Sequence, residues 1–269
     1  MINQVANING VLKEINPIVQ MIHNYVSANE CADGVIAIGA SPIITASVQE
    51  AEQVAYRANS ISMNAGTIND GQVESMILAG TMANDANIPV ILDPAGVSFS
   101  KFRAQSILKL LNKIKVSVIK GNYSEIAFLA DENVSSKGLD SFESDEYDCV
   151  NVALKLADKY SCTVILTNKV DIVADSSDVV KIYNGTPMLQ KLFCSGDMVG
   201  VLAAAYCGIT RNFLTASTAA ASIVSLAGEI AAEELVDELD FGTFKTNFFN
   251  YLSKIDSDTI KNRLQLLVY

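Results

Sequence analysis

Short apolar and β-branched runs alternate with longer helical patterns along most of this chain. The expected strands up to residues 164–166 are nearly all apolar, without the polar alternation of a half-exposed strand. Such strands belong to parallel sheets that helices cover on both faces. The strands expected after them follow one another without helices between them, which indicates an antiparallel edge. We therefore predict an α/β fold with a mostly parallel central sheet, helices on both faces and antiparallel edge strands.

The chain is long enough for one large α/β domain. We expect strands at residues 60–63, 90–92, 116–119, 164–166, 172–174, 179–183 and 188–193. We expect helices at residues 5–14, 29–38, 48–58, 70–86, 101–112, 123–129, 150–159, 198–207, 212–235 and 243–255. The charged segments 131–132 and 135–148 are expected to form a surface loop rather than a domain boundary. Residues 1–269 are therefore predicted to form a single domain.

Composition narrows the classes of protein to which the chain can belong. Of its 269 residues, 50% are hydrophobic and 18% are charged, which is enough apolar material for a large core. No apolar run reaches the roughly 18 residues of a membrane span, and residues 1–7 lack the basic start of a signal peptide. We therefore expect a cytoplasmic protein that does not associate with a membrane. The net charge of −11 argues against nucleic-acid binding, although a local site with a metal ion can still hold phosphate.

The cysteines and the single histidine argue against disulfide bonds, histidine-based zinc sites and a Ser-His-Asp triad. The five cysteines have no paired spacing, and their odd number indicates free thiols. His23 is the only histidine. A histidine-based zinc site and a Ser-His-Asp triad are therefore nearly excluded.

The stretch 193–198, Phe-Cys-Ser-Gly-Asp-Met, joins an expected strand to a run of small apolar residues. Ser195, Gly196 and Asp197 would be the first residues of a buried helix. Their backbone N–H groups have no partner inside the helix and carry the positive end of its dipole. Asp197 is then either a simple helix cap or a base beside a phosphate-binding helix N-terminus.

Polar residues follow five of the expected strands. In sheets of this kind ligands bind beyond the carboxyl ends of the strands, so these residues are expected to meet at one rim. They occupy positions 64–67, 93–96, 120–125, 167–169 and 194–197. Each segment also has a purely structural explanation as a turn or a cap; Asn122 and Glu125, for example, fit a capping box.

Taken together, these residues supply what phosphoryl transfer requires. Asp93 and Glu125 are hard oxygen ligands suited to Mg²⁺, and Lys120 is a cation for nucleotide phosphate. Ser195 and Gly196 would offer backbone donors to the phosphoryl group, and Asp197 would accept a hydroxyl proton. This chemistry depends mostly on positioning and charge neutralisation.

The chain resembles the hydroxyethylthiazole kinase family, a branch of the ribokinase-like kinases, over nearly its whole length. The shared motifs are His-Asn-Tyr-Val at 23–26, Gly-Ala-Ser-Pro at 39–42, Asn-Ala-Gly-Thr at 64–67, Pro-Val-Ile-Leu-Asp-Pro-Ala-Gly-Val at 89–97 with Arg103 downstream, Val-Ile-Lys-Gly-Asn-Tyr-Ser-Glu-Ile at 118–126, Asn-Gly-Thr-Pro-Met at 184–188 and Ala-Gly-Glu-Ile-Ala at 227–231. The Ala-Ser-Pro and Gly-Asn-x-Ser-Glu stretches together are fairly specific to this branch.

The resemblance implies a ribokinase-like fold and ATP-dependent phosphorylation of the primary alcohol of 4-methyl-5-(2-hydroxyethyl)thiazole, a step of thiamine salvage. It also implies Mg²⁺ and a homotrimer with the thiazole site between subunits, although an acidic monomer fits the composition equally well. By position, the implied roles are nucleotide binding for Lys120, Thr167 and Asn122, metal binding for Asp93 and Glu125, and lining of the thiazole pocket for Asn24, Ile44, Gly66, His23 and Cys194, beside the catalytic Ser195, Gly196 and Asp197.

The chain departs from the family pattern around this site. The family turn Gly-Thr-Gly-Cys is here Cys-Ser-Gly-Asp at 194–197, and Asp197 restores the base of the wider ribokinase-like group. A carboxylate is charged at neutral pH, whereas an ordinary thiol is mostly protonated. Cys194 would be strained if its backbone needed a positive φ. His23 replaces a threonine and is more simply a pocket wall than a proton carrier.

Three functions remain open from the sequence. The leading hypothesis is a kinase for hydroxyethylthiazole or another small alcohol. A non-catalytic sensor that binds thiazole or nucleotide is the second, because Gln20-Met21, Ser98, Asn168 and Cys194 all depart from the family pattern. An ATP-dependent dehydratase is the third, but the Ala-Ser-Pro and Asn-Ala-Gly-Thr motifs point away from it.

Overall fold

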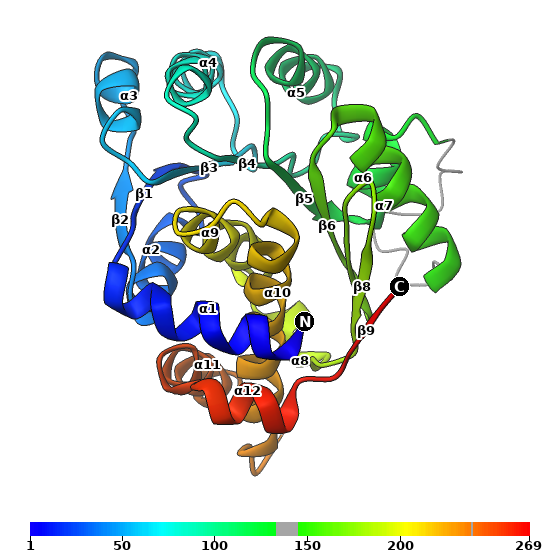
Figure 1. The fold of residues 1–269 in the computed structure, drawn as a ribbon. Coiled ribbons are helices and arrows are strands. Elements are labelled where there is room, and N and C mark those ends of the chain that lie inside the picture. The colour runs from blue at the N-terminus through cyan, green and yellow to red at the C-terminus, as the bar shows by residue number, and fades with distance from the viewer. Residues whose placement is uncertain (133–144, 238) are drawn as a thin grey trace.

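A nine-stranded sheet crosses the molecule in the order β2-β1-β3-β4-β5-β6-β7-β8-β9 (Figure 1). The structure, a computed structural model, describes residues 1–132, 145–237 and 239–269. The parallel strands are β1 (Ile18–Ile22), β2 (Ser41–Ile44), β3 (Ser60–Asn64), β4 (Val90–Asp93), β5 (Val118–Asn122) and β6 (Thr163–Thr167). The strands β7 (Asp171–Ala174), β8 (Val179–Ile182) and β9 (Leu266–Val268) continue the sheet in antiparallel pairing. The predicted mostly parallel sheet with an antiparallel edge is confirmed.

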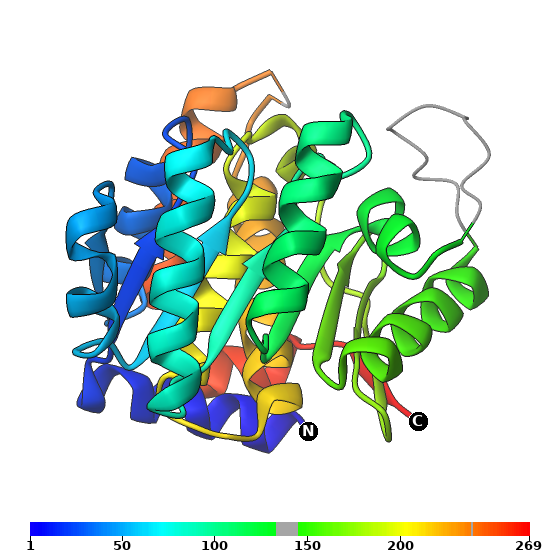
Figure 2. The same ribbon diagram turned by 90° about the horizontal axis from the view of Figure 1, so that it is seen from above.

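Helices cover both faces of the sheet. One face carries α3 (Val48–Ala55), α4 (Asp70–Asp85), α5 (Lys101–Lys113), α6 (Tyr123–Leu129) and α7 (Glu146–Tyr160), of which α3, α4 and α5 lie side by side in Figure 2. The other carries α1 (Ile2–Ile15), α2 (Ala28–Ala37), α8 (Met188–Lys191), α9 (Ser195–Cys207), α10 (Phe213–Glu233), α11 (Phe241–Lys254) and α12 (Ser257–Arg263). Successive strand residues point to opposite faces. Met21 therefore joins the core under α9 and Ile22 the core under α4.

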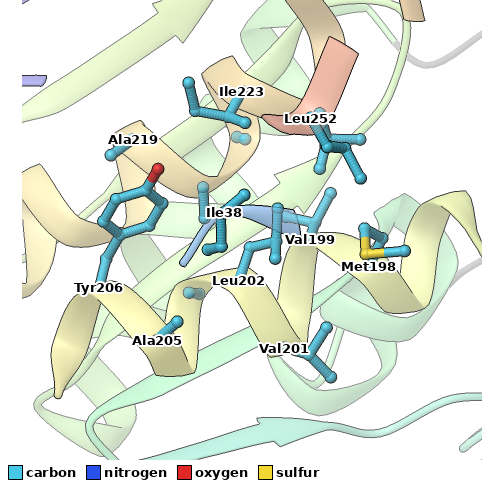
Figure 3. Packing of buried hydrophobic residues seen from close by; sticks show 14 of the residues in the cluster. Ile38, Met198, Val199, Val201, Leu202, Ala205, Tyr206, Ala219, Ile223 and Leu252 are labelled. Carbon is cyan, nitrogen blue, oxygen red and sulfur yellow. The ribbon is translucent and has the colours of Figure 1, made fainter. Parts of the chain in front are cut away.

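Helix α9 is the centre of the larger core. Its apolar side chains pack against the sheet and α10, and Figure 3 shows Val199, Leu202 and Tyr206 near Ala219 and Ile223. The hydroxyl of Tyr206 is buried and donates a hydrogen bond of 2.6 Å to Asn9 Oδ1, which satisfies this polar group inside the core. Helix α9 also contacts β3, β4 and β5, which places it beside the strands of the candidate site.

Helix α10 is the only helix in the described part of the chain whose length and apolar character would allow it to cross a membrane. Most of it is buried inside the protein. It contacts α9, α11 and strands β6 to β8, so it is a core helix of this fold.

Five elements differ from the sequence-based expectation. Residues 188–193 were predicted as a strand, but Met188–Lys191 form the short helix α8. The apolar residues of segment 188–193 lie at positions i, i+1, i+4 and i+5, a spacing that fits a helix as well as a strand. Pro187 is the N-cap residue of α8. The segment before α9 is therefore a short helix, where a strand was expected. The strands β1, β2 and β9 and helix α12 were missed.

The missed strands have weak local signals. The strand β1 has the polar Gln20 at its centre, and β2 contains Pro42, which a sheet tolerates at its edge. The strand β9 has only three residues, and tertiary pairing with β8 fixes it. The predicted surface loop, residues 131–132 and 135–148, lies largely outside the described residues. Its last part was predicted wrongly, because residues 146–148 form the first turn of α7.

Candidate active site

The N-terminus of α9 lies beside the carboxyl ends of β3, β4 and β5. The helix begins at Ser195, whose hydroxyl donates a hydrogen bond of 2.7 Å to the carbonyl of Leu189. Cys194 is the N-cap residue and makes no side-chain cap bond in the described part of the chain. A Cβ atom at Gly196 would lie 3.5 Å from Lys120 Nζ. The dipole end of α9 and a lysine ammonium therefore face the same space, an arrangement that attracts anions.

Cys194 is unstrained at this position. Its φ is −80°, in the right-handed region, so the replacement of a family glycine has no conformational cost here. Its side chain is buried in the core with α9. Burial raises the pKa of the Cys194 thiol to about 11, with a further contribution from Glu30.

Asp197 is held by side chains from two other strand ends. Asn24 Nδ2 donates to Asp197 Oδ2 over 3.0 Å, and the Ser27 hydroxyl donates to the same oxygen. Asn64 Nδ2 donates to Asp197 Oδ1 over 2.9 Å. A residue that only caps α9 would bond the backbone of its own helix. The carboxylate of Asp197 instead receives three side-chain donors from outside the helix.

These donors keep Asp197 charged. Burial by itself raises the pKa of this carboxyl group, but the charge of Lys120 and the hydrogen bonds from Ser27 and Asn24 outweigh burial. The pKa of Asp197 is therefore lowered from its ordinary value. A carboxylate that is ionised at neutral pH can accept a proton from an alcohol during its reaction.

Asp93 and Lys120 form a buried ion pair at the ends of β4 and β5. Lys120 Nζ lies 3.0 Å from Asp93 Oδ2, and both side chains are at most 6% exposed. Burial raises the pKa of Asp93, against the pull of Lys120. Burial lowers the pKa of Lys120, but Asp93, Glu125 and Asp197 together raise it above its ordinary value. Lys120 is therefore the positive centre of a strongly negative site.

Glu125 completes the capping box that the sequence suggested for α6. Its Oε2 accepts a hydrogen bond of 2.9 Å from the backbone N–H of Asn122, whose Oδ1 accepts one from the N–H of Glu125. Glu125 Oε1 accepts a further bond of 2.8 Å from the N–H of Gly96. The carboxylate therefore joins the loop after β4 to the loop after β5. It also contributes to the repulsion that raises the pKa of Asp93.

The oxygen atoms of Asp93 and Glu125 fit a magnesium ion that is shared with phosphates. Among the described residues, Asp93 Oδ1 is buried and has no hydrogen-bond partner. Within the same residues, no group of three or more His, Cys, Asp or Glu side chains could enclose a metal. Magnesium is commonly bound by one or two carboxylates together with substrate phosphates rather than by an all-protein cage. The donor set therefore suits Mg²⁺ brought in with a nucleotide.

Thr167 and Asn122 lie side by side at the ends of β6 and β5, where they are paired in the parallel register. The Thr167 hydroxyl donates to the carbonyl of Gly121 over 3.4 Å. Asp171 fixes the turn that follows, because its carboxylate accepts bonds from Asn168 N–H and the Ser225 hydroxyl. Burial raises the pKa of Asp171 to about 6.

Asn24 and Gly66, two of the residues predicted to line the thiazole pocket, lie together in the structure. Gly66 approaches Asn24 and Asn64 so closely that a Cβ atom would lie 2.9 Å from Asn64 Oδ1. His23 precedes Asn24 and is buried; burial lowers its pKa, so the imidazole is neutral. Ile44 is the last residue of the outer strand β2, where it is paired with Met21 of β1, and it is 48% exposed.

Three residues of the site had no predicted role. Asn64 directly follows an expected strand, which was the available signal. Arg103 stood in a family motif; its guanidinium donates to the carbonyls of Ala65, Gly66 and Ala95 over 2.7, 2.8 and 2.9 Å. Ser27 had no signal in the sequence, because its proximity to Asp197 arises from contacts between distant segments.

Comparisons with known proteins point to one family. The model of the Hydroxyethylthiazole kinase family matches residues 10–258. A hydroxyethylthiazole kinase of Clostridioides difficile is 40% identical over 249 residues, covering 93% of this chain and 94% of the relative. One of Alkaliphilus oremlandii is 38% identical over 261 residues, covering 97% and 96%.

Solved structures give the same result for the fold. A hydroxyethylthiazole kinase structure from Pyrococcus horikoshii OT3 superposes with a TM-score of 0.89 at 29% identity and covers 98% of both chains. A pyridoxal kinase from Staphylococcus aureus, solved with AMP-PCP and pyridoxal, has a TM-score of 0.62 at 12% identity, with 94% and 98% coverage. At that identity the second likeness concerns the fold alone.

Proposed function

The chain belongs to the hydroxyethylthiazole kinase family, and on that premise we propose that it uses ATP to phosphorylate 4-methyl-5-(2-hydroxyethyl)thiazole in the cytoplasm, as a step of thiamine salvage. The hydroxyl oxygen of the thiazole alcohol forms a bond to the terminal phosphorus of ATP. The bond from that phosphorus to the bridging oxygen breaks, and ADP leaves. The hydroxyl proton passes to Asp197.

The observation that carries this proposal is the place of Asp197. Its ionised carboxylate lies in the first turn of α9, whose N-terminal dipole and neighbouring Lys120 attract phosphate. A base and an anion site thus adjoin each other. Phosphoryl transfer to an alcohol requires this pairing, with the remaining work done by positioning and charge.

The nucleotide is proposed to lie across the ends of β5 and β6. Lys120 would contact its phosphates, and Thr167 and Asn122 would lie along it, at the ends of paired strands. The backbone N–H groups of Ser195 and Gly196 would bind the phosphoryl group in transit. Gly196 suits this role because its missing side chain leaves the space before Lys120 Nζ open.

Asp93 and Glu125 would hold Mg²⁺ at the same phosphates. When bound, the ion neutralises phosphate charge as it develops in transfer. The buried Asp93 Oδ1, which has no hydrogen-bond partner among the described residues, supports this assignment. The role of Glu125 fits its position between the β4 and β5 loops.

The acceptor is proposed to bind beside Asn24, His23 and Gly66, with Cys194 behind the pocket. Ile44, at the end of the outer strand β2, is 48% exposed. We further propose a homotrimer with the thiazole site between subunits, in which this exposed side chain faces a neighbouring copy. The exposed apolar residues at this edge support it: Tyr25, Val26, Ile43 and Ile44 are 81, 51, 39 and 48% exposed.

The test is a turnover assay with ATP, Mg²⁺ and the thiazole alcohol, in which the product gains the mass of one phosphate. Asp197→Asn keeps the shape of the side chain but cannot accept the proton, so we expect kcat to fall about 10²–10⁴-fold. Asp158→Asn, an exposed acid on α7, is the matched control and should keep full activity.

Two outcomes would contradict the proposal. Full turnover by Asp197→Asn would remove Asp197 as the base. Nucleotide binding by the wild-type protein in calorimetry, without product from this or any screened alcohol, would favour the non-catalytic sensor.

A further inference from the structure

Asn64 uses every hydrogen-bonding position of its side chain inside the site. Its Nδ2 donates to Asp197 Oδ1 over 2.9 Å and to Asp93 Oδ2 over 3.1 Å. Its Oδ1 accepts from Asn24 Nδ2 over 2.9 Å and from the backbone N–H of Gly66 over 2.8 Å. The side chain is 1% exposed, so no solvent competes for these bonds.

We propose that Asn64 is a positioning residue that fixes the Asp197 carboxylate relative to the Asp93–Lys120 pair and leaves Asp197 Oδ1 as the oxygen that takes the proton. This inference rests on the proposed kinase function and assigns a role within it. Asn64 itself does not touch the reacting atoms. It acts through the two carboxylates that it joins.

The choice between the two oxygens of Asp197 follows from their partners. A carboxylate oxygen accepts about two hydrogen bonds in the plane of the group. Oδ2 is filled by Asn24 Nδ2 and the Ser27 hydroxyl. Oδ1 receives only the bond from Asn64 among the described residues. One acceptor position on Oδ1 is therefore left for the hydroxyl of the alcohol.

The orientation of the Asn64 amide is determined by its surroundings. Both partners of its Oδ1 are N–H donors, and both partners of its Nδ2 are carboxylates. A flipped amide would set donors against donors and oxygen against oxygen, losing all four bonds. The main chain adds to this constraint, because Asn64 and Asp93 are paired in the register of β3 and β4.

An amide suits this position better than a carboxylate would. Asp93, Glu125 and Asp197 already place three acids around the single charge of Lys120. A neutral donor between Asp93 and Asp197 bonds both and adds no charge. Because Lys120 and Asn64 share Asp93 Oδ2, a displacement of Asn64 would move the base and the phosphate-side ion pair together.

The experiment compares Asn64→Asp and Asn64→Ala with the wild type by steady-state kinetics. Asn64→Asp keeps the shape and the acceptor oxygen but removes both donors once its new carboxyl group ionises. We expect kcat to fall about 100-fold for each variant, as misplaced catalytic groups typically do, with a smaller change in KM. For Asn64→Asp the loss should grow as pH rises.

Two further measurements separate positioning from a structural role. In the Asp197→Asn background, either Asn64 substitution should cause no further loss, because residues that act as a unit are not additive. The carboxyl carbon of Asp197, followed by NMR titration, should show a higher pKa in both variants because a donor to the charged form is lost. Asn9→Ala, which removes a buried asparagine distant from the site that bonds Tyr206 and Ile255, should lower the melting temperature alone.

The outcomes distinguish this inference from the proposed function. Loss of activity in Asp197→Asn with wild-type kinetics and an unchanged Asp197 titration in both Asn64 variants would overturn the role of Asn64 alone. A wild-type protein without turnover would overturn the kinase proposal, and the NMR titration would still decide whether Asn64 sets the state of Asp197. If Asn64→Ala does not fold, Asn64→Asp carries the same test.

Discussion

At the scale of single residues, the site is arranged to keep one carboxylate charged in a buried place. Three neutral side chains, Asn24, Ser27 and Asn64, donate to Asp197, and Lys120 supplies the nearby positive charge. Hydrogen bonds to a charged form stabilise that form. The family pattern Gly-Thr-Gly-Cys, to which residues 194–197 correspond, has a cysteine in place of Asp197. An unperturbed thiol is mostly protonated at neutral pH.

Replacing Asp197 with cysteine should therefore make the reaction depend on pH in a range where the wild type does not. Because the pKa of Asp197 is lowered, its charged form is complete well below pH 7 and is lost only as pH falls further. A thiol ionises near pH 8.5. We expect Asp197→Cys to be at least about 10-fold slower at pH 7 and to gain rate as pH rises to 9.

The measurement is kcat against pH from 7 to 9 for both proteins, with Asp197→Asn as the variant that has no group to ionise. A rate for Asp197→Cys that stays flat over this range would show that proton acceptance at residue 197 does not limit the reaction.

At the scale of elements, the site depends on loops held by groups from helices. Arg103, on α5, donates to three carbonyls in the loops after β3 and β4. Gly66 lies in the first of these loops, and the second loop begins directly after Asp93. Glu125 performs a similar task between the β4 and β5 loops. The helices on this face therefore do more than cover the sheet, because they set the spacing of its carboxyl ends.

Removal of Arg103 should make the loops of the site less well positioned without removing any of the proposed catalytic side chains. Arg103→Ala leaves the carbonyls of Ala65, Gly66 and Ala95 without this donor, which we expect to cost about 1–3 kcal/mol of unfolding free energy. We also expect kcat to fall about 10-fold, since small misplacements are costly in catalysis. Arg103→Lys, with one compact ammonium group, should recover part of both losses.

Chemical unfolding and turnover assays measure the two effects. Lys109→Ala, an exposed change on the same helix, is the control. An Arg103→Ala protein with wild-type kcat and unfolding midpoint would show that the loops hold their places without the guanidinium.

At the scale of the whole molecule, one of the two outer strands of the sheet, β2, carries the exposed apolar residues Ile43 and Ile44. Exposed edges invite pairing with another chain unless they are protected. Ile44 was predicted to line the thiazole pocket, and within one chain it is 48% exposed. A second copy at this edge would bring an additional wall to the pocket, as the proposed trimer requires.

Ile44→Glu should therefore affect assembly and substrate binding together. We expect the wild type to sediment with the mass of about three 28.8 kDa chains and the variant to shift toward the monomer, with a higher KM for the thiazole alcohol. Leu108→Glu places the same charge on an apolar residue of α5 that is 39% exposed and should leave both properties unchanged. A monomeric wild type, or a variant that stays trimeric with the wild-type KM, would contradict the proposal.

The class of the fold could be predicted from the sequence, and so could a set of candidate site residues. Apolar strands separated by helical patterns are typical of a covered parallel sheet, and the rule that ligands bind beyond strand ends selected Asp93, Lys120 and Glu125. Asp197 was selected as part of a helix start, although the strand expected before it is the helix α8. The first residues of α9 were predicted at their observed positions, because a polar glycine-containing turn before small apolar residues is a strong local signal. Local signals were insufficient for β1, β2 and the segment 188–191.

The interactions among these residues depend on the folded structure. The bonds of Asp197 join it to Asn24, Ser27 and Asn64, which lie 173, 170 and 133 positions away in the sequence. No pattern within one element encodes such distances, because strand order and register set them. The same holds for the pKa of Asp197: burial opposes its charge, and only the assembled donors and Lys120 outweigh that opposition.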